Sequence, residues 1–198
     1  MRAVIFDFDG TLGDTFGIVM KGVNKLALEE GYDLDVENLR DKSLKRILKE
    51  DLKLGWWGFL KYVRIVKSRL NNDLKKAKLF PGVKGLILDL RKYYKVGIVT
   101  SNSKDIVCGV LGKVEVDFLH HNSALFGKHR ILRKLKEKYG QIVYVGDEIR
   151  DIEACKKAGV KVIAVSWGYN SKKALKKCDP DYLVDEVKDI AKIMKGFV

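Results

Sequence analysis

The chain has 198 residues, of which 46% are hydrophobic and 33% are charged, a composition typical of a folded globular protein and not of a disordered one. No apolar run reaches the roughly 18 residues that a membrane-spanning helix needs, and the amino-terminal segment meets acidic residues too early for a secretory signal. Three widely spaced cysteines, Cys108, Cys155 and Cys178, argue against a disulfide framework. We therefore expect a cytoplasmic protein with no membrane partner.

The net charge of +13, from 39 Lys and Arg against 26 Asp and Glu, raises the question of an anionic partner. The cations are spread along the chain and recur at helical spacing between apolar positions, as in residues 45–49, 61–67, 133–138 and 172–177. Such spacing is typical of solvated helix faces. We therefore do not expect a dedicated nucleic-acid surface, although a basic phosphatase that trims nucleic-acid ends is kept as an alternative.

The first segment, residues 2–7, is a β-branched apolar run that ends in acidic residues and a glycine, which predicts a buried strand followed by a functional loop. From about Thr15 to Leu79 the apolar residues recur at helical intervals, and glycines mark the breaks. This change predicts a helical insert of about 65 residues. Within it, the Gly-Trp-Trp-Gly-Phe stretch at 55–59 suits either a surface that closes over a site or the insert's own core.

After residue 80, predicted helices and strands alternate along the chain. We expect helices over residues 83–94, 104–111, 128–139, 149–158 and 187–194, and strands over 96–100, 116–119, 142–145, 160–165 and 182–184. This alternation predicts βαβ units and a parallel sheet. The expected fold class is α/β: a Rossmann-like parallel-sheet core formed by residues 1–14 and 80–198, with an α-helical subdomain inserted over residues 15–79.

Ligands of a parallel sheet bind beyond the carboxyl ends of its strands. The residues that stand there, or that open the helices beyond, are acids, hydroxyls, an amide, a lysine and a glycine: Asp7, Asp9, Gly10, Thr100, Ser101, Asn102, Lys128, Asp147, Glu148 and Asp151. Carboxylates gathered at one edge repel each other unless a cation lies among them, and hard oxygen ligands suit Mg²⁺. The set therefore predicts a Mg²⁺ site.

These residue types also suit phosphoryl transfer. A carboxylate nucleophile at Asp7 would form a mixed anhydride, which splits one difficult displacement into two easier steps. Asp9, two residues on, would protonate the leaving alcohol and then deprotonate the attacking water. Gly10 would let the backbone approach the phosphate, while the Thr100 hydroxyl and the Lys128 charge would stabilise the phosphoryl oxygens.

Each of these signals has a plainer interpretation when it is taken singly. Thr100 alone suits an ordinary strand end, Lys128 alone suits the surface, and Asp147 with Asp151 would favour a helix N-terminus through its dipole. What favours the catalytic interpretation is order and placement, since every member lies at the end of a predicted strand or at the start of the next helix.

The chain resembles the haloacid dehalogenase superfamily, and within it the phosphatases that carry a helical cap after the first strand. Four motifs carry the resemblance: D-F-D-G-T-L at 7–12, V-G-I-V-T-S-N at 96–102, F-G-K at 126–128 and V-G-D-E-I-R-D at 145–151. Two further segments, L-F-P-G-V at 79–83 and W-G-Y at 167–169, resemble the return from the cap and a loop of phosphoglycolate-phosphatase-like members.

The resemblance implies a phosphatase that forms a phospho-aspartyl intermediate on a small phosphate ester, either phosphoglycolate-like or a sugar phosphate. It implies Mg²⁺ held by the Asp7 side chain, the Asp9 main-chain carbonyl and Asp147, with Asp151 as a supporting acid. It assigns the phosphate to residues of the first three motifs, namely Gly10, Thr100, Ser101, Asn102 and Lys128. The residues 15–79 would form the cap that selects the substrate.

Two departures and two alternatives accompany the resemblance. His129 stands where many relatives have proline, which is expected to weaken the local anchoring of Lys128. Glu148 replaces a small residue and is expected either in the outer coordination shell of the metal or facing solvent.

A dehalogenase would need no proton donor at Asp9, which argues against that activity. A phosphomutase would share every motif and is kept as an alternative; the oligomeric state is left open.

Overall fold

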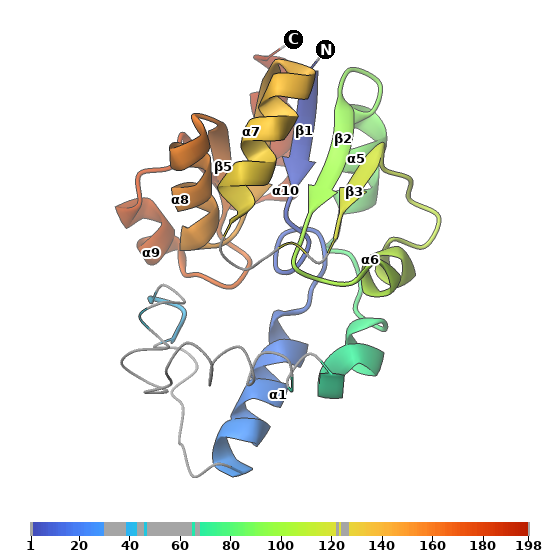
Figure 1. Ribbon diagram of the computed structural model, residues 1–198, viewed down its shortest axis with the longest axis vertical. Helices are drawn as coiled ribbons and strands as arrows, with labels where there is room; N and C mark the ends of the chain where they lie inside the picture. The colour runs from blue at the N-terminus through green and yellow to red at the C-terminus, as the bar shows by residue number, and fades with distance from the viewer. Residues whose placement is uncertain are drawn as a thin grey trace.

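A computed structural model of the chain describes residues 2–29, 39–42, 46, 65, 68–121, 123 and 127–197 (Figure 1). Six parallel strands form one sheet in the order β3-β2-β1-β4-β5-β6. They are β1 (Arg2–Phe6), β2 (Lys95–Val99), β3 (Phe118–His120), β4 (Gln141–Gly146), β5 (Lys161–Val165) and β6 (Tyr182–Val184). The helices are α1 (Phe16–Glu29), α5 (Val83–Leu90), α6 (Lys104–Leu111), α7 (Lys128–Tyr139), α8 (Ile149–Ala158), α9 (Lys172–Lys177) and α10 (Val187–Lys195). The predicted α/β fold with a parallel sheet is confirmed.

Both faces of the sheet are covered, which explains why its strands read as continuous apolar runs. Alternate residues of β1 point to opposite faces: Val4 and Phe6 pack with α5, α6 and α10, whereas Ala3 and Ile5 pack with α7 and α8. Figure 1 shows α7 and α8 in front of the sheet and α10 behind it. The result is two apolar layers with β1 in the middle.

The position of β1 between β2 and β4 decides where a site forms. The chain builds β1, β2 and β3 outward in one direction and then returns to build β4, β5 and β6 in the other, so the loops after β1 and β4 diverge and leave a crevice. The chain stays close to β4 just beyond β1, since the backbone N–H of Asp7 donates to the carbonyl of Val145 at 2.8 Å.

The insert predicted for residues 15–79 is described in part. It contains α1 and a helical segment at 68–74, and a Cβ built on Gly22 would lie 2.6 Å from Leu70, so these two helices pack closely. The segments by which the chain enters and leaves the insert lie side by side. Asp14 N donates to Lys78 O at 2.8 Å, and Phe80 N donates to Leu12 O at 2.9 Å. The aromatic stretch at 55–59 lies outside the described residues, and the boundaries of the insert stay a prediction.

The remaining differences from the predicted elements are small. The helix α5 ends at Leu90, four residues early, because the chain turns there and buries Tyr94, whose hydroxyl donates to Met194 O at 2.7 Å. The short helix α9 was not predicted as an element, although the cations of residues 172–177 recur at helical spacing. Ser171 caps it, and the Ser171 hydroxyl accepts from Ala174 N at 3.1 Å. Within the described residues, no helix is long and apolar enough to cross a membrane.

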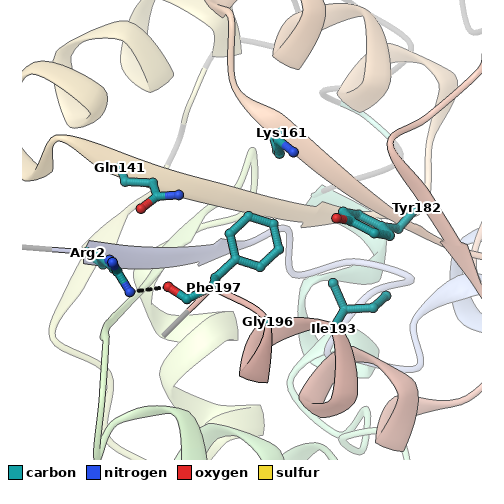
Figure 2. Close-up of a pocket in the computed structure, with 7 residues that line it drawn as sticks. All are labelled: Arg2, Gln141, Lys161, Tyr182, Ile193, Gly196 and Phe197. Carbon is teal, nitrogen blue, oxygen red and sulfur yellow. Dashed lines mark hydrogen bonds between the residues drawn. The ribbon is translucent and has the colours of Figure 1, made fainter.

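A pocket of about 380 Å³ lies at the amino-terminal edge of the sheet (Figure 2). Its walls are the first residues of four strands, together with the end of the chain: Arg2, Gln141, Lys161, Tyr182, Ile193, Gly196 and Phe197. No carboxylate side chain lines it, and it stands at the opposite edge of the sheet from Asp7. It is therefore separate from the acidic residues considered next.

Candidate active site

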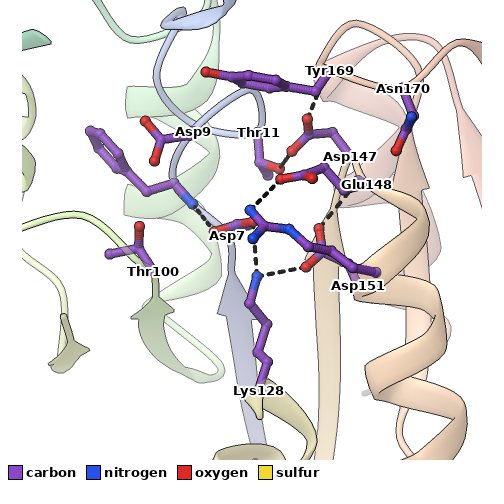
Figure 3. Close-up of polar contacts among 12 residues, drawn as sticks. Asp7, Asp9, Thr11, Thr100, Lys128, Asp147, Glu148, Asp151, Tyr169 and Asn170 are labelled. Carbon is purple, nitrogen blue, oxygen red and sulfur yellow. Dashed lines mark hydrogen bonds and ion pairs between the residues drawn. The ribbon is translucent and has the colours of Figure 1, made fainter. Parts of the chain in front are cut away.

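Three buried carboxylates meet at the carboxyl-terminal edge of the sheet (Figure 3). Asp7 follows β1, Asp147 follows β4, and Asp151 lies in the first turn of α8. Each offers an oxygen within 4.8 Å of the other two. The pairing of β1 with β4 brings these distant parts of the sequence together. Because buried negative charges are costly unless they are compensated, this arrangement calls for cations.

One compensating charge is Lys128, the first residue of α7. Its Nζ lies 2.9 Å from Asp7 Oδ2 and 2.6 Å from Asp151 Oδ1 (Figure 3). The hydroxyl of Tyr144 lies 2.7 Å from the same nitrogen. Burial lowers the pKa of Lys128, but the charges of Asp151 and Asp7 outweigh burial and hold that pKa above its ordinary range. The lysine is a fixed positive charge whose three N–H donors all face protein oxygens.

The structure contradicts the expectation that Lys128 is weakly anchored. Lys128 is only 7% exposed and makes three polar contacts, while the half-buried His129 follows it in α7. The helix start is held by the buried cluster, so a proline is not needed there. The third-motif residue Phe126 lies outside the described residues.

Asp147 is held from two sides. Its Oδ1 accepts from the Thr11 hydroxyl at 2.6 Å, and its Oδ2 accepts from the backbone N–H of Tyr169 at 2.7 Å. Burial, with the charges of Glu148 and Asp7 nearby, raises the pKa of Asp147 well above its ordinary value. The carboxylate is thus fixed in place and favours a bound cation as its counter-charge.

Two glycines make room for Asp147. A Cβ built on Gly10 would lie 2.3 Å from Asp147 Oδ2, and one built on Gly168 would lie 2.2 Å from the same atom. Gly10 also has a φ of 72°, a conformation that side chains disfavour. The structure therefore gives Gly10 a clear role in packing against Asp147, in addition to the predicted approach to phosphate.

Asp9 and the second motif face each other across the crevice. The side-chain amide of Asn102 donates to both oxygens of Asp9, at 2.8 and 2.9 Å. The Thr100 hydroxyl accepts from Asn102 N at 3.0 Å and still has its own O–H to donate. Ser101, between them, is half-buried. Asn102 was predicted to bind phosphate, and in this structure its amide binds Asp9.

The carboxylate of Asp7 is oriented but poorly solvated. Its Oδ1 accepts from Phe8 N at 2.8 Å and its Oδ2 from Lys128. Burial raises the pKa of Asp7 to about 7, because desolvation outweighs the attraction of Lys128 and is reinforced by Asp151. Without a further cation, this carboxyl therefore holds its proton far more tightly than an exposed aspartate.

Glu148 and Arg150 form an ion pair at the rim of the acid cluster. The Glu148 side chain is 14% exposed. Of the two positions expected for it, the solvent-facing one does not fit, and the one in the outer shell of a metal stays a prediction. The charge of Arg150 lowers the pKa of Asp7, whereas that of Glu148 raises it. This pair, together with Tyr144, Tyr169 and Asn170, was not predicted from the sequence. The charges of Glu148 and Arg150 within one motif were the only available signal for the pair.

Comparison with known proteins identifies the family of the chain. Residues 4–165 match the family model of haloacid dehalogenase-like hydrolases. The chain is 33% identical over 203 residues to a phosphoglycolate phosphatase of Synechococcus elongatus, covering 96% of this chain and 95% of that protein. It is 26% identical over 215 residues to a phosphoglycolate phosphatase of Aquifex aeolicus, covering 100% and 99%. A haloacid dehalogenase-like hydrolase structure from Streptococcus pneumoniae superposes with a TM-score of 0.78 at 20% identity, covering 97% of each chain. The chain therefore belongs to the haloacid dehalogenase-like hydrolase family.

Proposed function

We propose that the chain is a Mg²⁺-dependent phosphatase that hydrolyses a small phosphomonoester through a phospho-aspartyl intermediate on Asp7. The observation that carries this proposal is the buried cluster of Asp7, Asp147 and Asp151 around Lys128 at the carboxyl edge of the sheet. The likeness to phosphoglycolate phosphatases, at 33% identity for the Synechococcus protein, supports the same reaction class.

The residues of the cluster fit a divalent cation. Lys128 pairs with Asp7 and Asp151, and Glu148 pairs with Arg150. Among the described residues, the carboxylates of Asp7, Asp147, Asp151 and Glu148 thus outnumber these two cations by two. The two carboxylate oxygens of Asp151 already accept hydrogen bonds, one from Lys128 and the other from the backbone N–H of Glu148. As the family resemblance implies, Asp7, Asp147 and the main-chain carbonyl of Asp9 would hold Mg²⁺. When bound, Mg²⁺ would supply positive charge that orients and neutralises the phosphoryl oxygens.

The side chains of this chain would share the remaining work. Phe8 N and Lys128 hold the Asp7 carboxylate in one orientation for attack on phosphorus. Asp9, held by Asn102, would give a proton to the leaving oxygen and later take one from water. The Thr100 hydroxyl and Lys128 would stabilise the charge of the transferred group.

The substrate class follows from the relatives and is part of the proposal. We infer a small phosphate ester of the phosphoglycolate type, because two relatives that match nearly the whole chain, those of Synechococcus elongatus and Aquifex aeolicus, are phosphoglycolate phosphatases. The insert, residues 15–79, would act as the cap that selects among such esters. It leaves and returns through paired backbone segments at 12–14 and 78–80, a suitable place for a hinge.

A panel of phosphate esters tests the proposal. Purified protein should release inorganic phosphate from phosphoglycolate or a sugar phosphate in Mg²⁺, lose this activity in EDTA and recover it when Mg²⁺ is restored. Analysis of the sugar-phosphate product separates hydrolysis from mutase activity, since a mutase returns an isomer in place of free phosphate. Full activity in metal-free buffer, or an isomerised product, would overturn the proposal.

A further inference from the structure

The side chain of Asn170 connects the insert to the acid cluster. Asn170 is buried, at 7% exposure, in the loop that follows β5. Its Nδ2 donates to two carbonyls of the insert, Arg40 O at 2.9 Å and Lys42 O at 3.0 Å. Its Oδ1 accepts from the backbone N–H of Ile149, the first residue of α8, at 2.9 Å. The buried amide thus uses both of its N–H donors on the insert and its oxygen on the first residue of α8.

The insert segment 39–42 makes further contacts with the same loop. Ser171 N donates to Arg40 O at 3.0 Å, and Arg40 Nη2 donates to Gly168 O at 2.9 Å. The guanidinium of Arg40 also lies 4.8 Å from the ring centre of Phe16 in α1. In Figure 1 this cyan segment lies below the loops beside α8 and α9. The segment is therefore docked on the core through backbone groups as well as side chains.

The loop that receives the insert also holds Asp147. Tyr169 N donates to Asp147 Oδ2 at 2.7 Å, and Asn170 N donates to Asp147 O at 3.3 Å. Ile149, the partner of Asn170 Oδ1, lies two residues after Asp147. Asn170 therefore contacts the backbone at Asp147 itself and two residues after it.

We propose that Asn170 is a positioning residue that couples docking of segment 39–42 to the orientation of Asp147. If the segment leaves, both donors of the buried amide lose their partners, and an unpaired buried donor is costly. The amide then reorients, and its bond to Ile149 N is lost with it. Coupling between two sites is reciprocal, so a cation bound at Asp147 favours docking of the segment. The inference rests on the proposed function, because Mg²⁺ is the cation used to test it.

Amide hydrogen exchange on the full chain, read residue by residue, tests the coupling. The N–H of Ser171 reports docking because it donates to Arg40 O, and the N–H of Ile149 reports the bond to Asn170. In the wild-type protein, Mg²⁺ should slow exchange at Ser171. In Asn170→Ala, Mg²⁺ should no longer change this rate, and the Mg²⁺ affinity measured by calorimetry should fall about fivefold or more.

Two variants separate coupling from a general loss of structure. Asn170→Asp keeps an acceptor for Ile149 N but removes both donors to the insert. The added negative charge alone would raise the affinity for Mg²⁺. A fall in Mg²⁺ affinity in this variant therefore points to lost coupling. Lys42→Ala keeps the main-chain carbonyl that Asn170 binds and should respond to Mg²⁺ as the wild-type protein does.

The outcomes distinguish the two proposals. Suppose that Mg²⁺ binds the wild-type protein but slows exchange at Ser171 as much in both Asn170 variants as in the wild type, or does not slow it in the wild type at all. The coupling is then wrong, and the proposed function stands. If calorimetry finds no Mg²⁺ binding to the wild-type protein, the proposed function fails and the coupling fails with it.

Discussion

The side-chain amide of Asn102 lies 2.8 Å from one carboxylate oxygen of Asp9 and 2.9 Å from the other. The contact joins the second motif, which follows β2, to the first motif, which follows β1. It fixes the group that the proposed mechanism uses twice, once as an acid and once as a base.

Asn102→Ala should therefore weaken proton transfer without removing the nucleophile. A positioned general acid contributes roughly 10²–10⁴-fold and matters most for poor leaving groups. We expect kcat to fall more for an alkyl phosphate than for p-nitrophenyl phosphate, and Asp9→Asn should show the same pattern more strongly. Steady-state kinetics on both esters measures it, and an equal loss on the two esters would contradict the role of this contact.

Replacement of the nucleophile should separate activity from folding. Asp7→Asn keeps the size of the side chain and should lose nearly all turnover, since an amide cannot form the mixed anhydride. Circular dichroism should show an unchanged fold. Turnover of p-nitrophenyl phosphate near the wild-type rate would rule out a covalent intermediate on Asp7.

The same variant should change how stability depends on pH in EDTA. Burial raises the pKa of Asp7 to about 7, above its ordinary value in the unfolded chain. The folded state therefore binds the proton more tightly, and its stability falls as pH rises from about 4 to about 7. Asp7→Asn lacks this dependence. Thermal unfolding across this pH range should show the wild-type protein losing stability relative to the variant, and parallel curves would contradict the raised pKa.

Tyr144→Phe should test how tightly Lys128 is held. The change removes the hydroxyl 2.7 Å from Nζ and leaves one buried N–H without its partner. We expect unfolding free energy to fall by about 1–3 kcal/mol. Tyr139→Phe is the matched control, since that ring stacks on Phe118 away from the acid cluster. Urea unfolding of both variants measures the difference, and equal losses would mean that the Tyr144 hydroxyl adds nothing through Lys128.

Gly168→Ala should inactivate the protein by displacing Asp147. The new Cβ would lie 2.2 Å from Asp147 Oδ2, so the carboxylate or the loop must move. Gly85→Ala is the control: in α5 no heavy atom lies within 4 Å of the added Cβ, and alanine should stabilise the helix by about 0.5–1 kcal/mol. Activity and melting temperature should thus fall in Gly168→Ala only. An active Gly168→Ala would contradict the close approach.

The fold was predictable from the sequence because the local signals for helices and strands were strong. The predicted bounds of α6, α7 and α8 agree with the structure, since each helix is apolar on one side and the chain breaks at glycine after each. Strand ends placed Asp7 and Asp147 at one edge before any contact was known. For this reason the meeting of Asp7 and Asp147 was predictable from the ends of the predicted strands.

The partners within the cluster were not predictable, because they depend on distances across the fold. Tyr144 reads as an ordinary strand residue until α7 brings Lys128 to its hydroxyl. Asn170 follows a recognisable motif, yet its three side-chain partners come from residues 40, 42 and 149. Local periodicity contains no information about such contacts.

The central position of β1 has a consequence for the order in which the protein is made. In the sheet β1 lies between β2 and β4, and β4 begins only at residue 141. A nascent chain that has just completed β3 can pair one edge of β1 but must leave the other edge open. Asp7 therefore meets Asp147 only after β4 has been synthesised. The acid cluster cannot form before that point, even though Asp7 follows directly after β1.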